Sequence, residues 1–257
     1  MSRLVIALMV IVVVAGIVFR ARTSEMSVAD SGRKARKVQI WVDQSTSICA
    51  EQRTKWLGYL DLVLQKLQPN DLVEVFDISD ATAGTSPLFS RVAPQLPEDA
   101  TKSEGDDYQD KLTEFQDGLQ QALDRAFAGA QRNVLSTDIF SLFARFRPDA
   151  KRVGVLFLLT DGLHVDAAEF KGKRINMEQH LADVNTLSFV EEVSARYQWD
   201  SGTLAHARVT LLLPDAAVCP QLPKADIFRV KEIYGALVAA AGGSLNQVET
   251  YLNGGEL

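Results

Sequence analysis

Three oxygen-bearing side chains stand at alternate positions directly after a short apolar run, in the sequence Asp43-Gln44-Ser45-Thr46-Ser47. Hard cations such as Mg²⁺ take oxygen ligands, and serine hydroxyls supply oxygen without adding negative charge. The pattern D-x-S-x-S therefore predicts a hard-cation site where a buried strand ends. About one chain in twenty of this length contains the pattern by chance, so the motif needs support from elsewhere in the chain.

Two other segments offer the same kind of ligand. Thr137 precedes a short apolar helix, and Asp161 directly follows the most apolar strand expected in the chain, 153–159. In open parallel sheets, ligands bind beyond the carboxyl ends of the strands, where the strand order reverses. If strands 38–42 and 153–159 are neighbours at that reversal, Asp43 and Asp161 converge there, with the Thr137 loop beside them.

Strands and helices alternate along the chain, which predicts an α/β fold: a doubly wound, mainly parallel sheet with helices on both faces, in one domain. Short apolar runs predict the strands, and apolar residues at helical spacing predict the helices. The expected strands are 38–42, 72–78, 88–92 (at an edge), 153–159 and 209–213, and the expected helices are 56–67, 112–127, 139–146, 181–197 and 227–238.

The three motifs together resemble the von Willebrand factor A (vWA) domain with its metal-ion-dependent adhesion site (MIDAS). That family has D-x-S-x-S after the first strand, a Thr before a short helix, and an Asp, usually followed by Gly, after the central apolar strand. Two features depart from the family pattern: Ser136 stands where Gly is more common, and residues 79–107 have no clear counterpart in the family. All five positions are filled in order, within a vWA-like domain at 37–250: Asp43, Ser45, Ser47, Thr137 and Asp161.

The resemblance implies a Rossmann-like vWA fold and a bound Mg²⁺ or Mn²⁺. Ser45, Ser47 and Thr137 would ligate the ion directly, and Asp43 and Asp161 directly or through water. With few charged groups around it, the metal would keep much of its charge and an open position. A carboxylate of a partner protein can occupy that position, so we expect metal-dependent protein binding and no enzymatic activity.

Two other functions stay open. A Mg²⁺-dependent phosphohydrolase on a similar sheet normally has a second acid two residues after its nucleophilic Asp, and a Lys that holds phosphate. Ser45 occupies that second position here, which argues against catalysis. Alternatively, the domain is a scaffold subunit of a membrane complex, with a vestigial metal site.

Each candidate ligand also has a structural alternative. Ser45, Ser47, Thr137 and Asp138 all stand ahead of helical segments, where N-caps are common, and Asp161 followed by Gly is typical of a turn. Capping and turn roles leave the coincidence of three motifs unexplained, so we favour metal binding, with Asp138 as a helix cap.

Other polar residues near the expected site are interpreted as solvated. His164 follows Asp161 by three residues and could border the site, although a lone loop histidine is more often exposed. A small basic cluster could also help to receive an acidic partner. The residues in this group are His164, His180 and His206, Asp77 and Asp80, and Lys171, Lys173 and Arg174.

An uncharged apolar segment, Leu4–Phe19, has arginines on both sides and predicts membrane insertion. The cleavage signal after it is poor, which favours an uncleaved anchor over a signal peptide. We divide the whole chain into a transmembrane anchor or signal segment at 1–22, a polar tether at 23–36, the vWA-like domain at 37–250 and a tail at 251–257. Basic residues on both sides of the segment leave its orientation in the membrane open. We expect a single-pass membrane protein and favour an orientation in which the domain lies on the exported side.

The bulk composition suits one globular core, since 47% of the 257 residues are hydrophobic and 23% are charged. The net charge of -6 argues against a nucleic-acid surface. Cys49 and Cys219 lack the spacing of a zinc or redox motif and are interpreted as buried thiols. A disulfide between them is the alternative if the domain is exported, since the sequence leaves open whether they meet in space.

Overall fold

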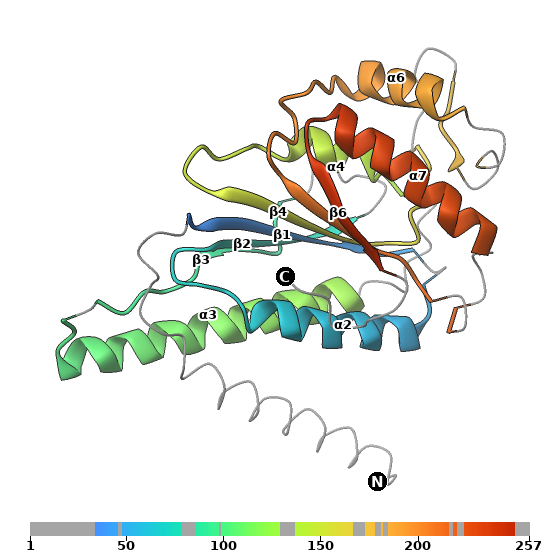
Figure 1. Ribbon diagram of the computed structural model, residues 1–257. Coiled ribbons are helices and arrows are strands. Elements are labelled where there is room, and N and C mark those ends of the chain that lie inside the picture. The colour runs from blue at the N-terminus through green and yellow to red at the C-terminus, as the bar shows by residue number, and fades with distance from the viewer. Residues whose placement is uncertain are drawn as a thin grey trace, which may run out of the picture.

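The computed structural model describes residues 34–45, 48–78, 86–97, 99–128, 137–166, 173–177, 181, 185–215, 218–219 and 224–249. Six strands within these residues form one sheet in the order β3-β2-β1-β4-β5-β6 (Figure 1). Every neighbouring pair is parallel except β2 and β3, which are antiparallel. The predicted α/β fold with a mainly parallel sheet is confirmed.

The strands are β1 (Arg36–Asp43), β2 (Leu72–Ile78), β3 (Phe89–Val92), β4 (Val153–Leu159), β5 (Arg208–Leu212) and β6 (Ser244–Glu249). The described helices are α2 (Ala50–Leu64), α3 (Lys102–Ala128), α4 (Phe140–Arg145), α6 (Thr186–Tyr197) and α7 (Lys224–Ala240). All five expected strands and all five expected helices are present. Strands β2 and β4 have the expected ends, the ends of the others are shifted, and β3 lies at an edge as expected.

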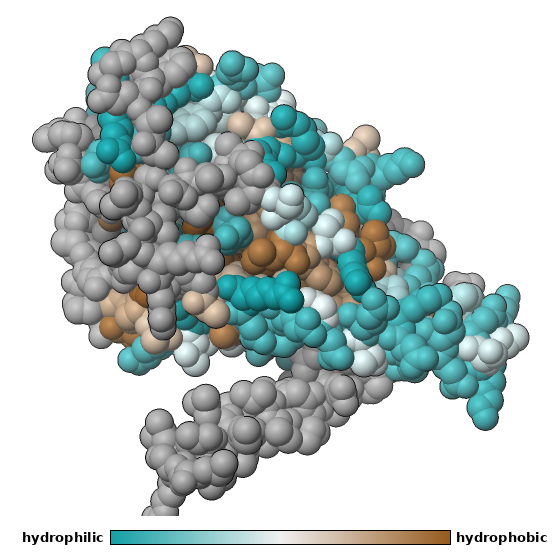
Figure 2. Space-filling view, turned by 180° about the vertical axis from the view of Figure 1, so that it is seen from behind, coloured by the Kyte–Doolittle hydropathy of each residue, from teal (hydrophilic) through white to brown (hydrophobic). Residues whose placement is uncertain are grey.

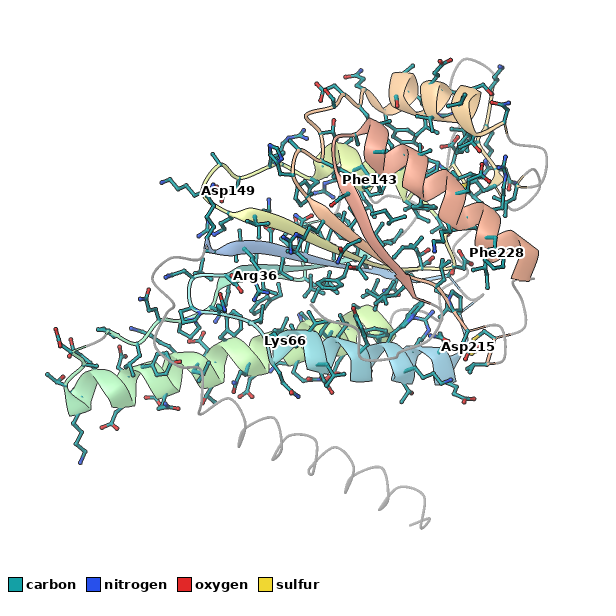
Figure 3. All side chains as sticks on the ribbon, viewed as in Figure 1. Arg36, Lys66, Phe143, Asp149, Asp215 and Phe228 are labelled. Carbon is teal, nitrogen blue, oxygen red and sulfur yellow. A yellow bond between two sulfur atoms is a disulfide. The ribbon has the colours of Figure 1, made fainter. Side chains whose placement is uncertain are left out.

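Helices cover both faces of the sheet, with α2 and α3 on one face and α4, α6 and α7 on the other (Figure 1). Side chains alternate between the two faces along a strand. In β1, Ile40 and Val42 therefore belong to the hydrophobic core under α2 and α3, whereas Trp41 belongs to the core under α4 and α7. By the same alternation, Asp43 faces the α4 and α7 side. Figure 3 shows side chains between the sheet and the helices on both faces, with Phe143 on the side of α4.

The start of α3 and the whole of β6 differ from the expectation. The helix begins at Lys102 rather than at 112, because Thr101 and Glu104 form a capping box: the Thr101 hydroxyl accepts from the Glu104 N–H at 3.3 Å, and the Glu104 carboxylate accepts from the Thr101 N–H at 2.8 Å. The early turns carry few apolar residues, so periodicity alone misses them. Figure 2 shows α3 as a mainly hydrophilic surface, with hydrophobic side chains gathered above it.

Strand β6 was not predicted because its two apolar residues, Leu245 and Val248, do not alternate in sequence. The pairing with β5 shifts register between Val209 and Thr210, which pair with Leu245 and Gln247. One extra residue in a bulged strand reverses the alternation after it. The irregular sequence pattern therefore follows from the bulge.

Several predicted features lie outside the described residues: the apolar segment 4–19, residues 23–33 of the tether, Ser47, Asp80, Lys171, His180 and the tail 251–257. Within the part of the chain that the structure describes, none of the helices combines the length and the apolar composition needed to cross a membrane.

Candidate functional site

The carboxyl ends of β1 and β4 lie side by side at the centre of the sheet. Val42 pairs with Leu159, so Asp43 at the end of β1 is next to Thr160 and Asp161. The Thr160 hydroxyl donates a hydrogen bond of 2.6 Å to Asp43 Oδ2. These two strands also mark the point where the strand order reverses, since β2 and β3 extend on one side and β5 and β6 on the other. The expectation that the two strands are neighbours is confirmed.

Asp43 is a fully buried carboxylate, with 0% of its surface exposed. Besides the bond from Thr160, its Oδ1 accepts a hydrogen bond of 2.7 Å from the Ser45 N–H. Burial raises the pKa of Asp43, and hydrogen bonds from Thr160 and Ser45 and the charge of Arg53 offset this only in part. The described surroundings therefore leave a negative charge at this position incompletely compensated.

The loop after β1 is held by Arg53, a largely buried side chain on α2. Its guanidinium donates to three main-chain carbonyls, at 3.3 Å to Asp43, 2.8 Å to Ser45 and 3.1 Å to Ile48. These bonds hold the main chain at Asp43, Ser45 and Ile48, and they go to carbonyl oxygens rather than to the Asp43 carboxylate. Helix α2 begins with Cys49 as its N-cap, without a side-chain cap, so Ser45 does not cap it.

Thr137 is buried and is joined to the loop that follows Asp161. Its N–H donates to the Val165 carbonyl and its carbonyl accepts from the Val165 N–H, both at 3.1 Å. Asp161 begins the same loop, and its Oδ1 accepts from the Leu163 N–H at 2.9 Å. The segment that carries Thr137 is therefore joined by hydrogen bonds to the loop that carries Asp161. Among the predicted ligands in the described residues, Asp43 and Asp161 follow neighbouring strands and Ser45 follows Asp43.

The Asp138 side chain bonds to the first turn of the helix that follows. The Asp138 carboxylate accepts from the Ser141 N–H at 3.3 Å and from the Ser141 hydroxyl at 2.7 Å. Ile139 is the N-cap residue of α4 and makes no side-chain cap bond, so Asp138 supports the helix from one position earlier than a cap. In the described contacts Thr137 bonds through its main chain, so a capping role does not account for its side chain.

The prediction that His164 is exposed was wrong, because its side chain is completely buried. Its Nδ1 accepts from the N–H groups of Ile139 and Phe140, at 3.1 and 3.3 Å. The proton is therefore on Nε2, which lies 2.9 Å from Asp166 Oδ1. Burial lowers the pKa of His164, and Asp166 opposes this only in part. A neutral imidazole thus satisfies two N–H groups at the start of α4.

Asp166 anchors the other side of this histidine. The Tyr197 hydroxyl donates to Asp166 Oδ1 at 2.6 Å, and the Arg196 guanidinium lies 2.7 Å from Oδ2. Burial alone would raise the pKa of Asp166, but hydrogen bonds from His164, Tyr197 and Ile175 lower it. The carboxylate is charged and fully engaged, which makes this network a structural support for the Thr137 loop.

Gly162 sets the distance between the Asp161 turn and α7. Its φ is +78°, and a Cβ there would lie 2.5 Å from Val230 Cγ1 and 3.7 Å from Tyr234 Cε2. Only glycine fits this left-handed turn against the helix. As a result, α7 packs directly against the turn that carries Asp161, with the aromatic ring of Tyr234 in contact.

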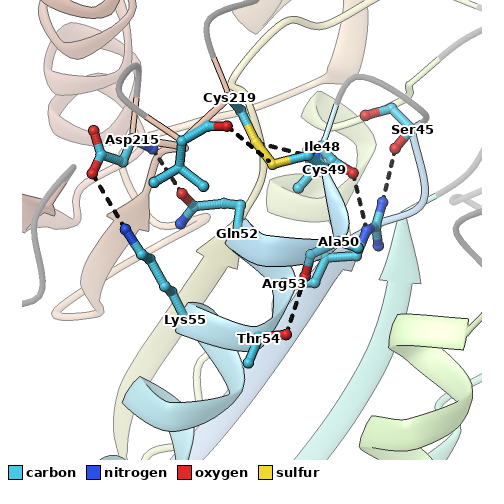
Figure 4. The surroundings of a disulfide bond; sticks show 11 residues. Ser45, Ile48, Cys49, Ala50, Gln52, Arg53, Thr54, Lys55, Asp215 and Cys219 are labelled. Carbon is cyan, nitrogen blue, oxygen red and sulfur yellow. Dashed lines mark hydrogen bonds and ion pairs between the residues drawn. A yellow bond between two sulfur atoms is a disulfide. The ribbon is translucent and has the colours of Figure 1, made fainter. Parts of the chain in front are cut away.

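Cys49 and Cys219 form a disulfide with a Cα–Cα distance of 6.0 Å (Figure 4). The interpretation as two free buried thiols was therefore wrong; their separation of 170 residues hid the contact. The bond joins the start of α2 to the loop after β5, where the Asp215 N–H also donates to Gln52 Oε1 at 2.8 Å. A disulfide suggests an oxidising, exported environment.

The other polar residues have mixed outcomes. His206, Lys173 and Arg174 are exposed, as expected. Asp77 lies within β2 and is half-buried, so its interpretation as a solvated loop carboxylate was wrong.

The side chains at the candidate site offer the type of ligand atom that a hard cation binds. Two carboxylates, Asp43 and Asp161, and two hydroxyls, Ser45 and Thr137, supply only oxygen, the ligand type that a hard cation takes. Within the described ranges, no group of three or more His, Cys, Asp or Glu side chains is placed to hold a metal ion. A metal here would depend on hydroxyls and water, as the sequence motif predicts.

Two residues around the site escaped the sequence interpretation: Thr160 and Tyr234. Thr160 is a polar residue at the end of an otherwise apolar run, which was a usable signal. The role of Tyr234 depends on how its helix packs in the complete fold, as does the burial of His164.

A scan against protein-family models finds no match for the chain, and a search of the curated proteins finds no significant similarity.

Proposed function

We propose that this protein binds a divalent cation, Mg²⁺ or Mn²⁺, at the carboxyl ends of β1 and β4, and uses it to bind a carboxylate of a partner protein. The observation that carries the proposal is the adjacency of Asp43 and Asp161 on neighbouring strand ends, with the Thr137 loop bonded to the Asp161 loop through Val165. A vWA-like domain with a MIDAS-type site would have this arrangement. Metal bound here would supply a Lewis-acidic position for a partner's oxygen.

The chain's own residues would have separate tasks. Asp43 and Asp161 would provide negative charge, while Ser45, Ser47 and Thr137 would provide neutral oxygen. Thr160 orients Asp43 through its hydroxyl. The burial of Asp43 supports the proposal, because a cation would compensate a charge that the described surroundings compensate only in part.

We further propose that the segment at 4–19 tethers the domain to a membrane and that the domain lies on the exported side. The Cys49–Cys219 disulfide supports the exported side, because such bonds persist in oxidising compartments.

The direct test is calorimetric titration with Mn²⁺ of the wild-type protein, Asp43→Ala and Asp77→Ala. Asp77 is the matched control, because it stands beside Val42 near the same end of the sheet without belonging to the motif. We expect binding in the wild type and in Asp77→Ala and its loss in Asp43→Ala. Equal binding in all three proteins would contradict the proposal.

Affinity capture from membranes, in Mg²⁺ and in chelator, tests the partner. A partner retained only in Mg²⁺ and lost with Asp43→Ala supports metal-dependent protein binding. Equal capture by Asp43→Ala would favour a scaffold with a vestigial site, and turnover of a generic phosphate ester, abolished by Asp43→Asn, would favour a phosphohydrolase.

A further inference from the structure

Tyr234 has a buried hydroxyl without a hydrogen-bond partner. The residue lies in the middle of α7 with 0% of its surface exposed. Its hydroxyl is one of three buried side-chain polar atoms for which the described residues offer no partner; the others are Gln44 Oε1 and Trp199 Nε1. An orphaned buried hydroxyl costs about 1–3 kcal/mol, so its retention in a tightly packed core calls for an explanation.

The position of this hydroxyl relative to the candidate site provides one. The negative charges of Asp161 and Asp43 both act on Tyr234, and after burial they are the further causes that raise its pKa well above the usual value. The geometry agrees, because Tyr234 Cε2 would lie 3.7 Å from a Cβ on Gly162, the residue directly after Asp161. Because the phenol stays protonated, Tyr234 can act only as a hydrogen-bond donor or a weak neutral acceptor there.

Packing prevents the hydroxyl from finding water elsewhere. The ring of Tyr234 lies against the Gly162 turn on one side, and its centroid is 6.1 Å from that of Phe140. Val230 and Leu213, which also contact the position of Gly162, are buried as well. The aromatic ring thus packs between the Gly162 turn and Phe140, the first residue of α4.

We infer that the Tyr234 hydroxyl is a positioning group of the metal site, which donates a hydrogen bond to an oxygen that enters with the cation, either a metal-bound water or a carboxylate. The inference rests on the function proposed above. A protonated phenol is a poor metal ligand but a good donor to an oxygen polarised by a cation, and such a bond fixes the orientation of that oxygen. It also connects α7 directly to the occupancy of the site.

Tyr234→Phe removes the hydroxyl alone, and Tyr108→Phe, on α3 away from these loops, is the matched control. Without metal, we expect Tyr234→Phe to melt about 2–4 °C above the wild type, because an orphaned polar atom is gone. With saturating Mn²⁺ the wild-type hydroxyl gains a partner and its melting temperature reaches that of the variant. The rise in melting temperature on adding metal is therefore smaller in Tyr234→Phe than in the wild type. Its affinity for Mn²⁺ falls about five- to tenfold.

Calorimetry with Mn²⁺ alone and with Mn²⁺ plus acetate distinguishes the two oxygens. A loss of affinity with Mn²⁺ alone identifies metal-bound water, and a loss that emerges only with acetate identifies a carboxylate; both support the inference. If Asp43→Ala abolishes binding while Tyr234→Phe behaves like Tyr108→Phe in both titrations, the inference fails and the proposed function stands. If the wild type and Asp43→Ala bind Mn²⁺ equally, or neither binds it, both fail.

Discussion

Replacement of His164 should destabilise the fold and weaken the candidate metal site together. The imidazole accepts from two buried N–H groups, those of Ile139 and Phe140, and its Nε2 reaches the charged Asp166. His164→Ala leaves both N–H groups without an acceptor, at about 1–3 kcal/mol each, and opens a cavity. We expect a loss of about 3–5 kcal/mol in the free energy of unfolding.

Two conservative variants separate the two ends of the ring. In His164→Asn, the side-chain oxygen lies near the place of Nδ1 and still accepts from the N–H groups, so only the bond to Asp166 is lost, at about 1.5–3 kcal/mol. In His164→Gln, the amide can reach Asp166 but the two N–H groups are orphaned, at about 2–4 kcal/mol. Urea unfolding of the three variants should therefore order them as Asn, Gln and Ala, from the most to the least stable.

Acid should destabilise the wild type through the same residue. Because burial lowers the pKa of His164 from 6.5, the unfolded chain takes up a proton at a higher pH than the folded one, and stability is lost as the pH falls from 6.5 toward the folded pKa. The charged groups that face the ring are Asp166, Asp138 and Arg196. Asp166 has a lowered pKa and loses its own contribution only below 3.8. In the window below 6.5, His164→Asn should lose less stability than the wild type.

The support that His164 gives to Thr137 predicts a second effect. Val165 follows His164 and bonds to Thr137, so a displaced ring moves a predicted ligand. Calorimetry should show about a tenfold loss of Mn²⁺ affinity in His164→Gln, in line with other supporting residues around metal sites. Unchanged stability of His164→Ala would refute the capping role, and a destabilised His164→Gln with wild-type Mn²⁺ affinity would refute the positioning role.

Three other replacements test separate parts of the fold. Gly162→Ala should lower the free energy of unfolding by about 2–4 kcal/mol, because its Cβ would lie 2.5 Å from a valine methyl group of α7 and the φ of this residue is +78°. Gly105→Ala is the control: a Cβ there meets nothing within 4 Å, so the free energy of unfolding should rise by about 0.5–1 kcal/mol. Equal effects of the two replacements in urea unfolding would contradict the packing argument. Replacing Cys49 and Cys219 together by Ser should cost about 2–5 kcal/mol, and a wild-type protein whose unfolding does not respond to a reductant would show that the disulfide is not formed in solution. Asp71→Ala should cost about 3 kcal/mol, because this fully buried carboxylate lies 2.6 Å from the guanidinium of the arginine that begins β1. It acts at the amino end of the sheet, so a change in Mn²⁺ affinity would contradict its assignment as a purely structural group.

The sheet was predictable because its strands are short, mostly apolar runs, of which β4 is apolar throughout. Strands β2 and β4 have the expected ends, Leu72–Ile78 and Val153–Leu159. Strand β6 was missed because a bulge interrupts its alternation. The length of α3 was missed because a capping box begins it ahead of the apolar stripe. In both cases, local hydrogen bonding overrides the periodicity on which the prediction depended.

The candidate site was predictable in its chain positions but not in its supports. Asp43 and Asp161 come directly after apolar strands, so their places at strand ends follow from the pattern. The support that His164 gives to the start of α4 does not, since its Nδ1 accepts from an N–H group 25 residues earlier in the chain. Nothing local marks such a contact, and a single loop histidine suggests exposure. The disulfide was hidden for the same reason, as only the folded sheet brings Cys49 and Cys219 together.

The six residues from Asp161 to Asp166 connect most of the groups that surround the candidate site. Gly162 packs against α7, His164 satisfies the start of α4, and Val165 bonds to Thr137. Asp166 then fixes the end of the loop through an ion pair of 2.7 Å with Arg196. Because these contacts occur within one short loop, the spacing between Asp161 and Thr137 does not depend on a bound metal to set it. If the proposed cation binds, it would therefore enter beside a loop whose position these contacts already set, and its affinity would depend on them as much as on the ligands themselves.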